Sequence, residues 1–185
     1  IRQQLDAVFH KMERPLLLKL HLDSRPISQE LETFITALAG LSDKLEMAVA
    51  DSQGDAAMAP WVEVCQADGV PTGLAFHGVP SGHEFTSFVL GLYNAAGPGQ
   101  TIEEETKKKI ASIDQATDLK ILVTLSCTMC PDLVVAAQRI AAVNPRVSAH
   151  VYDIRHFEDI KNRYKVMSVP CLVINVERVS FGRKS

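Results

Sequence analysis

The chain has 185 residues, of which 46% are hydrophobic and 22% charged, so it can bury a core and is not disordered by composition. Its formal net charge of −3 gives no reason to expect nucleic acid or an anionic membrane as a partner. No apolar run approaches the roughly 18 residues that span a bilayer, and the N-terminal stretch lacks the basic-then-apolar order of a signal peptide.

The first half of the chain is predicted to alternate strands with helices. After an amphipathic helix in residues 1–15, residues 15–24 form a predicted strand with leucines on both faces at its start. Residues 27–44 carry apolar side chains at helical spacing, with Ser28 as the predicted N-cap. Further strands are predicted in residues 45–51, 59–68 and 72–80, and a closing helix in residues 81–97.

The second half shows the same alternation. The predicted helices occupy residues 101–114, 130–144 and 156–166. The predicted strands occupy residues 119–126, 147–153, 171–177 and 178–182. Helices between strands indicate crossover connections, so we expect a partly parallel sheet, and the last two strands are expected to form an antiparallel hairpin at one edge.

The matching order of elements in the two halves predicts a duplicated small domain. Leu17 and Ile121 stand at equivalent places in two apolar strands that each lead into a helix. Their spacing is far longer than the roughly 20–50 residues of a solenoid repeat. Residues 95–101 carry the Gly and Pro expected of a junction, so we predict one domain in residues 1–97 and a second in residues 98–185.

The most informative motif is Cys127-Thr128-Met129-Cys130, which lies between a predicted strand and a predicted helix. This order predicts Cys127 at the helix N-terminus, where unpaired N–H groups and the helix dipole lower the pKa of a thiol below about 8.5. Cys130 follows by nearly one turn, close enough to form a disulfide. The motif therefore predicts a reactive dithiol, with Cys127 as the exposed nucleophile and Cys130 as the resolving thiol.

Two other roles for the cysteine pair are open. A structural zinc site needs four ligands, usually from two such pairs, so Cys65, Cys171 or a histidine would have to complete it. A permanent structural disulfide would close a loop of only two residues and constrain the unfolded chain little. Four cysteines with one close pair are typical of a protein in a reducing cytosol, so we expect a cytoplasmic location.

Pro170 stands directly before an apolar predicted strand. A proline at this place can occupy a cis peptide bond and expose the preceding backbone beside an active site. The alternative is an ordinary strand-leading proline. The strand, cysteine pair and helix upstream favour the cis form.

Three stretches, residues 82–92 (GHEFTSFVLGL), 124–147 and 166–175, together resemble the N-terminal region of the alkyl hydroperoxide reductase flavoprotein subunit. The resemblance covers nearly the whole chain. It implies an α/β fold class with two tandem thioredoxin-like folds, built from mixed sheets flanked by helices. It also implies that only the second fold, the one that holds the cysteine pair, is redox-active.

This resemblance implies a thiol–disulfide oxidoreductase that takes electrons from the dithiol of a flavin domain and passes them to the disulfide of a peroxiredoxin. It assigns the redox pair to Cys127 and Cys130 and the cis-proline to Pro170. It also directs attention to Glu84, whose carboxylate could relay protons during exchange. For Glu84 the alternative is a helix-start residue favoured by the helix dipole.

No dinucleotide motif follows in this chain, so we expect FAD and NADH only on an attached or partner reductase domain. Because no Met precedes Ile1, the natural start is expected upstream. The sequence stops before the helix expected to close the second fold, so we expect either an excised domain or a free-standing relative. Cys171 is either a buried apolar thiol or a third redox cysteine. Two alternative functions are a stand-alone glutaredoxin-like protein disulfide reductase and a zinc-holding protein-binding module.

Overall fold

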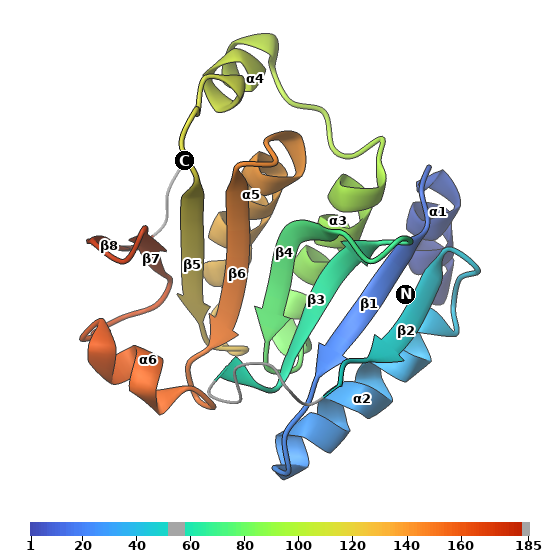
Figure 1. Ribbon diagram of the computed structural model, residues 1–185, viewed down its shortest axis with the longest axis horizontal. Helices are drawn as coiled ribbons and strands as arrows, with labels where there is room; N and C mark the ends of the chain where they lie inside the picture. Colours follow the sequence, from blue (N-terminus) through green and yellow to red (C-terminus); the bar gives the residue numbers. More distant parts are fainter. Residues whose placement is uncertain (52–57, 183–185) are drawn as a thin grey trace.

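The computed structural model describes residues 1–51 and 58–182. Within these residues the strands form one mixed sheet of eight strands, in the order β2-β1-β3-β4-β6-β5-β7-β8 (Figure 1). The strands are β1 (Leu16–His21), β2 (Leu45–Val49), β3 (Trp61–Gln66), β4 (Pro71–His77), β5 (Thr117–Val123), β6 (Val147–Asp153), β7 (Cys171–Ile174) and β8 (Arg178–Phe181). The helical elements are α1 (Arg2–Lys11), α2 (Pro26–Ala39), η2 (Gly82–Glu84), α3 (Phe85–Ala96), α4 (Glu104–Ala111), α5 (Cys130–Val143) and α6 (Glu158–Arg163). The predicted α/β fold with a mixed sheet flanked by helices is confirmed.

Each half contributes four strands in the same order. In the first half β1 pairs parallel with β2 and antiparallel with β3, and β3 continues antiparallel into β4. In the second half β5 pairs parallel with β6 and antiparallel with β7, and β7 forms the predicted hairpin with β8. This shared strand plan is the one expected of a duplicated domain, and the boundary between residues 97 and 98 stays a prediction.

The two halves are joined edge to edge by β4 and β6. These strands run parallel and pair from Leu74 with Ala149 through His77 with Tyr152. Gly73 enters this junction with a φ of +91°, and a Cβ atom there would lie 2.9 Å from the carbonyl oxygen of Val147. The absence of a side chain at Gly73 therefore lets the backbones of the two halves approach each other.

The large helices α2, α3 and α5 lie behind the sheet in the view of Figure 1. Alternate leucines of β1, such as Leu18 and Leu20, are fully buried and belong to the same core as Leu31 and Ile35 of α2. This core continues without a break into the second half. No helix in the described part of the chain is long and apolar enough to cross a membrane.

A row of stacked rings crosses the junction on the opposite side of β4. His21 stacks on Trp61 with ring centroids 4.0 Å apart, Trp61 on His77 at 5.0 Å, and His77 on Tyr152 at 4.0 Å. His77 is buried, which lowers its pKa, and its ring nitrogens contact the carbonyl oxygen of Met58 and Nδ1 of His150, each at 2.9 Å. Because the four rings come from β1, β3, β4 and β6, the row links the halves as well as the strands.

Helices α3 and α5 come from different halves and pack against each other behind the sheet. Gly91 of α3 lies at this contact, where an added Cβ atom would lie 2.8 Å from the amide group of Gln138 on α5. Gln138 is itself buried, so it has little room to move away. Gly91 thus allows the two helices to pack closely.

We expect Gly91→Ala to lower the free energy of unfolding by about 1 kcal/mol, because the cost of moving the buried amide of Gln138 exceeds the gain in helix propensity. Urea unfolding followed by circular dichroism measures this difference. Gly40→Ala is the matched control, since a Cβ atom there would meet backbone oxygens at an ordinary 3.5 Å. Equal midpoints for the two variants would contradict the tight helix contact.

Candidate functional site

Cys127 and Cys130 form a disulfide between the end of β5 and the start of α5, with their Cα atoms 5.6 Å apart. The side chain of Cys130 is completely buried, whereas that of Cys127 is partly exposed. An incoming sulfur can therefore reach Cys127 and not Cys130. The disulfide thus joins an accessible sulfur, that of Cys127, to an inaccessible one, that of Cys130.

The helix begins at Cys130, as the sequence predicted. Cys127 therefore lies just ahead of the helix, and its Sγ accepts a hydrogen bond from the backbone N–H of Cys130 at 3.1 Å. Unpaired N–H groups of a first helical turn stabilise negative charge on such a sulfur. This contact favours Cys127 as the thiolate when the pair is reduced.

Pro170 lies beside the strand that leads into the disulfide. The peptide bond between Val169 and Pro170 is cis, as the sequence predicted, and Pro170 is buried. β7 starts at the next residue and pairs antiparallel with β5 through Cys171 and Leu122. The backbone before Pro170 consequently runs past the end of β5 from which the cysteine pair follows.

Glu84 comes from the first half and lies beside the cysteine-pair segment of the second. It ends the short turn η2, which contacts α5, and the backbone N–H of His83 donates to the carbonyl oxygen of Leu125 at 3.1 Å. Gly82 fits against the same carbonyl, because a Cβ atom there would lie 2.9 Å from it. Leu125 is two residues before Cys127, so the turn carrying Glu84 packs against the segment that leads to the disulfide.

The carboxyl group of Glu84 is completely buried. Burial raises its pKa to about 7, and the hydrogen bond from Ser87 acts in the opposite direction. Ser87 donates to Oε2, while Oε1 has no hydrogen-bond partner among the described residues. The alternative interpretation of Glu84 was a helix-start residue favoured by the helix dipole, and Glu84 does lie at the start of α3. A carboxylate with that role alone would be exposed to solvent, whereas Glu84 is buried.

The two remaining cysteines, Cys65 and Cys171, are buried free thiols. Cys171 packs with Leu122 and Tyr152 in a separate core cluster, whereas Cys130 belongs to the main core. Burial raises the pKa of Cys171 to about 11 and that of Cys65 to about 12. Thiols with such pKa values are not nucleophiles near neutral pH, so the structure supports the apolar-thiol interpretation of Cys171.

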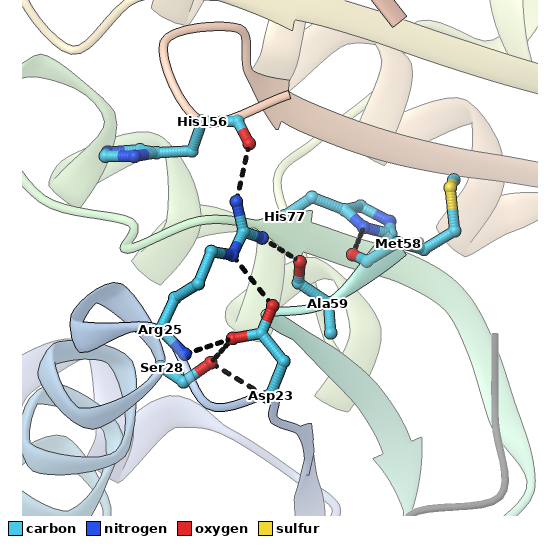
Figure 2. Close-up of polar contacts among 7 residues, drawn as sticks. All are labelled: Asp23, Arg25, Ser28, Met58, Ala59, His77 and His156. Carbon is cyan, nitrogen blue, oxygen red and sulfur yellow. Dashed lines mark hydrogen bonds and ion pairs between the residues drawn. The ribbon is translucent and has the colours of Figure 1, made fainter. Parts of the chain in front are cut away.

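In the first half, the loop that follows β1 stands where the cysteine pair follows β5, and it contains Asp23 and Arg25 (Figure 2). Helix α2 begins at Pro26 with Arg25 as its N-cap, so the predicted N-cap Ser28 is wrong. Pro26 starts the helix because its fixed φ suits the first turn. The Ser28 hydroxyl instead donates to the carboxylate of Asp23 at 2.6 Å and accepts the backbone N–H of Asp23 at 2.9 Å.

Arg25 ties this loop to two other segments. Its Nε donates to Asp23 at 2.8 Å, one terminal nitrogen to the carbonyl oxygen of His156 at 3.1 Å, and the other to the carbonyl oxygen of Ala59 (Figure 2). His156 lies between β6 and α6 in the second half, and Ala59 precedes Pro60 through a cis peptide bond. In the first half, the carbonyl oxygen before the cis-proline Pro60 therefore already accepts a hydrogen bond from Arg25.

Ser87 and Arg25 were not predicted to have a role in the site. Ser87 belongs to the stretch GHEFTS, and its spacing of three residues from Glu84 on a helix is a signal that could have found it. Arg25 left no comparable signal, because its partners Ala59 and His156 are distant in sequence. In residues 1–51 and 58–182, no group of three or more His, Cys, Asp or Glu side chains is arranged to hold a metal ion.

A reducible cysteine pair at the start of a helix, beside a cis-proline strand, defines a thiol–disulfide oxidoreductase domain of the thioredoxin class. The family profile described as thioredoxin domain matches residues 117–185. The structure matches the N-terminal domain of the alkyl hydroperoxide reductase AhpF from Enterococcus faecalis with a TM-score of 0.93 and 37% identity, over 100% of this chain and 93% of that one. A protein disulfide oxidoreductase from Aeropyrum pernix, 20% identical, shares the fold with a TM-score of 0.79 over 95% of this chain and 82% of that one.

The chain belongs to the AhpF family of alkyl hydroperoxide reductases, in the part that corresponds to the N-terminal domain. The AhpF protein of Pseudomonas aeruginosa is 31% identical over 183 residues, which are 99% of this chain and 34% of that protein. The chain therefore spans about a third of the length of the curated relatives it matches.

The buried carboxyl of Glu84 should make stability depend on pH. Its folded-state pKa of about 7 lies above the ordinary 4.5, so the folded protein holds this proton more tightly than the unfolded chain. That stabilising contribution is complete below the ordinary pKa and is lost as the pH rises through the folded-state pKa. Relative to Glu84→Gln, the unfolding free energy of the natural chain should fall by about 3 kcal/mol between about pH 4.5 and pH 8.

Urea unfolding of both proteins across this pH range measures the difference. A difference that does not change with pH would show that Glu84 has an ordinary pKa.

Arg25 should stabilise the junction of the first-half loop with the second half. Arg25→Lys cannot reach three acceptors with one ammonium group, so we expect a loss of about 1–2 kcal/mol in the free energy of unfolding. Arg178→Lys is the control, because Arg178 is exposed on β8. Urea unfolding of both variants is the measurement, and an equal effect of the two would mean that the Arg25 contacts contribute nothing.

Proposed function

We propose that this chain is the electron-relay part of a peroxiredoxin reductase. It accepts electrons from the dithiol of a flavin domain and passes them to the disulfide of a peroxiredoxin. The observation that carries the proposal is the disulfide with one accessible and one buried sulfur, in a fold that matches the N-terminal domain of AhpF over its full length.

Reduction of the pair begins at its exposed sulfur. A donor thiolate attacks Sγ of Cys127, the bond between Cys127 and Cys130 breaks, and Cys130 leaves as a thiolate that takes up a proton. The second donor thiol then attacks the donor sulfur bound to Cys127, which releases the Cys127 thiol and leaves the donor as a disulfide. The pair has gained two electrons and two protons.

Transfer to the acceptor starts from the Cys127 thiolate. It attacks one sulfur of the peroxiredoxin disulfide, and the other peroxiredoxin sulfur leaves as a thiolate. Cys130 then loses its proton and attacks Cys127, which expels the first peroxiredoxin sulfur and restores the disulfide. Burial of Cys130 keeps outside disulfides from competing for it during this step.

We propose that Glu84 donates the proton that Cys130 takes up on reduction and accepts it again on oxidation. A buried carboxyl with a pKa of about 7 is half-protonated near neutral pH, where it can both give and accept a proton. Residues 1–97 then supply the acid and the docking scaffold, and residues 98–185 supply the cysteine pair and Pro170. FAD and NADH belong to the flavin domain, attached or separate, and the cytoplasm is the compartment in which this relay works.

The roles of the two cysteines can be separated by single substitutions. The reduced chain, freed of small-molecule thiols, is mixed with an oxidised peroxiredoxin, and products are resolved by non-reducing electrophoresis and intact mass. Cys127→Ser should transfer no electrons, because the exposed nucleophile is gone. Cys130→Ser should accumulate the mixed disulfide with the peroxiredoxin, because nothing resolves it. Cys171→Ala is the control and should transfer like the natural chain.

Full multiple turnover by Cys130→Ser would overturn this assignment of roles. One bound zinc per chain, together with no reduction of insulin disulfides, would instead support the zinc-holding binding module. Rapid reduction of insulin with no reduction of any peroxiredoxin would support a general protein disulfide reductase.

A further inference from the structure

The hydroxyl group of Ser87 has one hydrogen and two acceptors within reach. Its Oγ lies 2.9 Å from the backbone carbonyl oxygen of Glu84 and also contacts Oε2 of the same residue. Ser87 lies in the first turn of α3, three residues after Glu84, and both side chains are buried. Water therefore does not compete for either group, so the hydrogen of Ser87 is confined to these two acceptors.

The contact makes the two oxygens of the Glu84 carboxyl unequal. Oε2 is held by Ser87, whereas Oε1 is buried and has no hydrogen-bond partner among the described residues. A buried carboxylate oxygen without a partner is costly, and it is the atom on which a proton is most readily accepted. Ser87 therefore decides which carboxyl oxygen is free.

We propose that Ser87 is a positioning residue that holds Oε2 of Glu84 and leaves Oε1 as the atom that exchanges a proton with Cys130. This inference rests on the proposed dithiol relay and extends it to the residue that orients its acid. The turn that holds Glu84 and the start of α3 is fixed against Leu125 by the His83 backbone, so the carboxyl cannot swing away with its whole segment.

The proton balance has two states. When Cys130 leaves as a thiolate, Oε1–H of Glu84 gives its proton to that sulfur and Glu84 becomes a carboxylate. Ser87 then directs its hydrogen fully to Oε2, because a charged acceptor is stronger than the backbone carbonyl. When Cys130 attacks the mixed disulfide, its proton returns to Oε1 and the Ser87 hydrogen is again shared with the carbonyl oxygen of Glu84.

Other titratable groups on the elements packed around Glu84 are few. His83 is exposed on the same turn, and Cys127, Cys130 and Asp132 belong to the cysteine-pair segment and α5. The pKa of Glu84 is raised by burial, and the Ser87 hydrogen bond is the contact that lowers it. Loss of the hydroxyl should therefore raise the pKa of Glu84 further and make it a proton acceptor only at higher pH.

The test follows the two steps of oxidation separately. Reduced chain reacts with 5,5′-dithiobis(2-nitrobenzoate) in stopped flow, where the first nitrothiobenzoate release reports attack by Cys127. The second release reports attack by Cys130 on the mixed disulfide, which is the step that needs a proton acceptor. The pH dependence of the second rate is measured for the natural chain and for Ser87→Ala, and a variant that lacks both Cys127 and Cys130 corrects for Cys65 and Cys171.

We expect Ser87→Ala to move the midpoint of the second phase upward by about one pH unit, so that its rate at neutral pH falls several-fold. The first phase should not change. Ser87→Thr, which keeps the hydroxyl, should restore the natural profile. If Ser87→Ala does not fold, Ser87→Cys removes the strong donor at nearly the same size and carries the same expectation.

Combining Ser87→Ala with Glu84→Gln shows whether Ser87 acts by orienting the Glu84 carboxyl or only by filling space in the core. If Ser87 acts through Glu84, Ser87→Ala should have no further effect on the second phase once Glu84 is Gln. An equal slowing in both backgrounds, or an unshifted profile for Ser87→Ala, would overturn the inference. If Glu84→Gln itself leaves the second phase unchanged, the proton role of Glu84 fails while disulfide exchange stands. Absence of two phases in the natural chain would instead refute the proposed relay.

Discussion

Everything at the site depends on the parallel pairing of β4 with β6. This pairing makes one sheet from two halves and sets the end of β4 only two strands away from β5, which leads to the cysteines. The chain that leaves β4 must turn toward α3 across this end of the sheet, and it does so in contact with Leu125. A carboxyl group from one half thereby comes to lie beside the disulfide segment of the other.

The two halves use the same place in the fold in opposite ways. After β5, the loop holds the disulfide between Cys127 and Cys130. After β1, the corresponding loop holds Asp23 and Arg25, whose polar groups are satisfied within the chain. Because the carbonyl oxygen of Ala59 accepts a hydrogen bond from Arg25, the backbone before Pro60 has an internal partner, while Pro170 stands directly before β7, the strand that pairs with β5. The loop after β1 is thus held by contacts within the chain, whereas the loop after β5 holds the reducible disulfide.

Much of the fold could be predicted because its signals are local. Leucines on both faces at the start of residues 15–24 predicted a strand, and the order strand, cysteine pair, helix predicted the disulfide correctly. One boundary was wrong and one was right. Ser28 was expected to cap α2, yet Pro26 starts that helix, since its fixed φ suits the first turn. The start of α5 at Cys130 agrees with the prediction.

Residue order along the chain was enough to identify the cysteine pair, the cis-proline and the class of chemistry, because a thiolate at a helix start needs only its own neighbours in sequence. The state of Glu84 could not be obtained in that way. A carboxyl at a helix start is ordinarily exposed and ionised, and its burial here follows from the packing of two distant segments. Its raised pKa depends on the packing of its turn against the segment that leads to the disulfide, since desolvation is a property of the assembled fold.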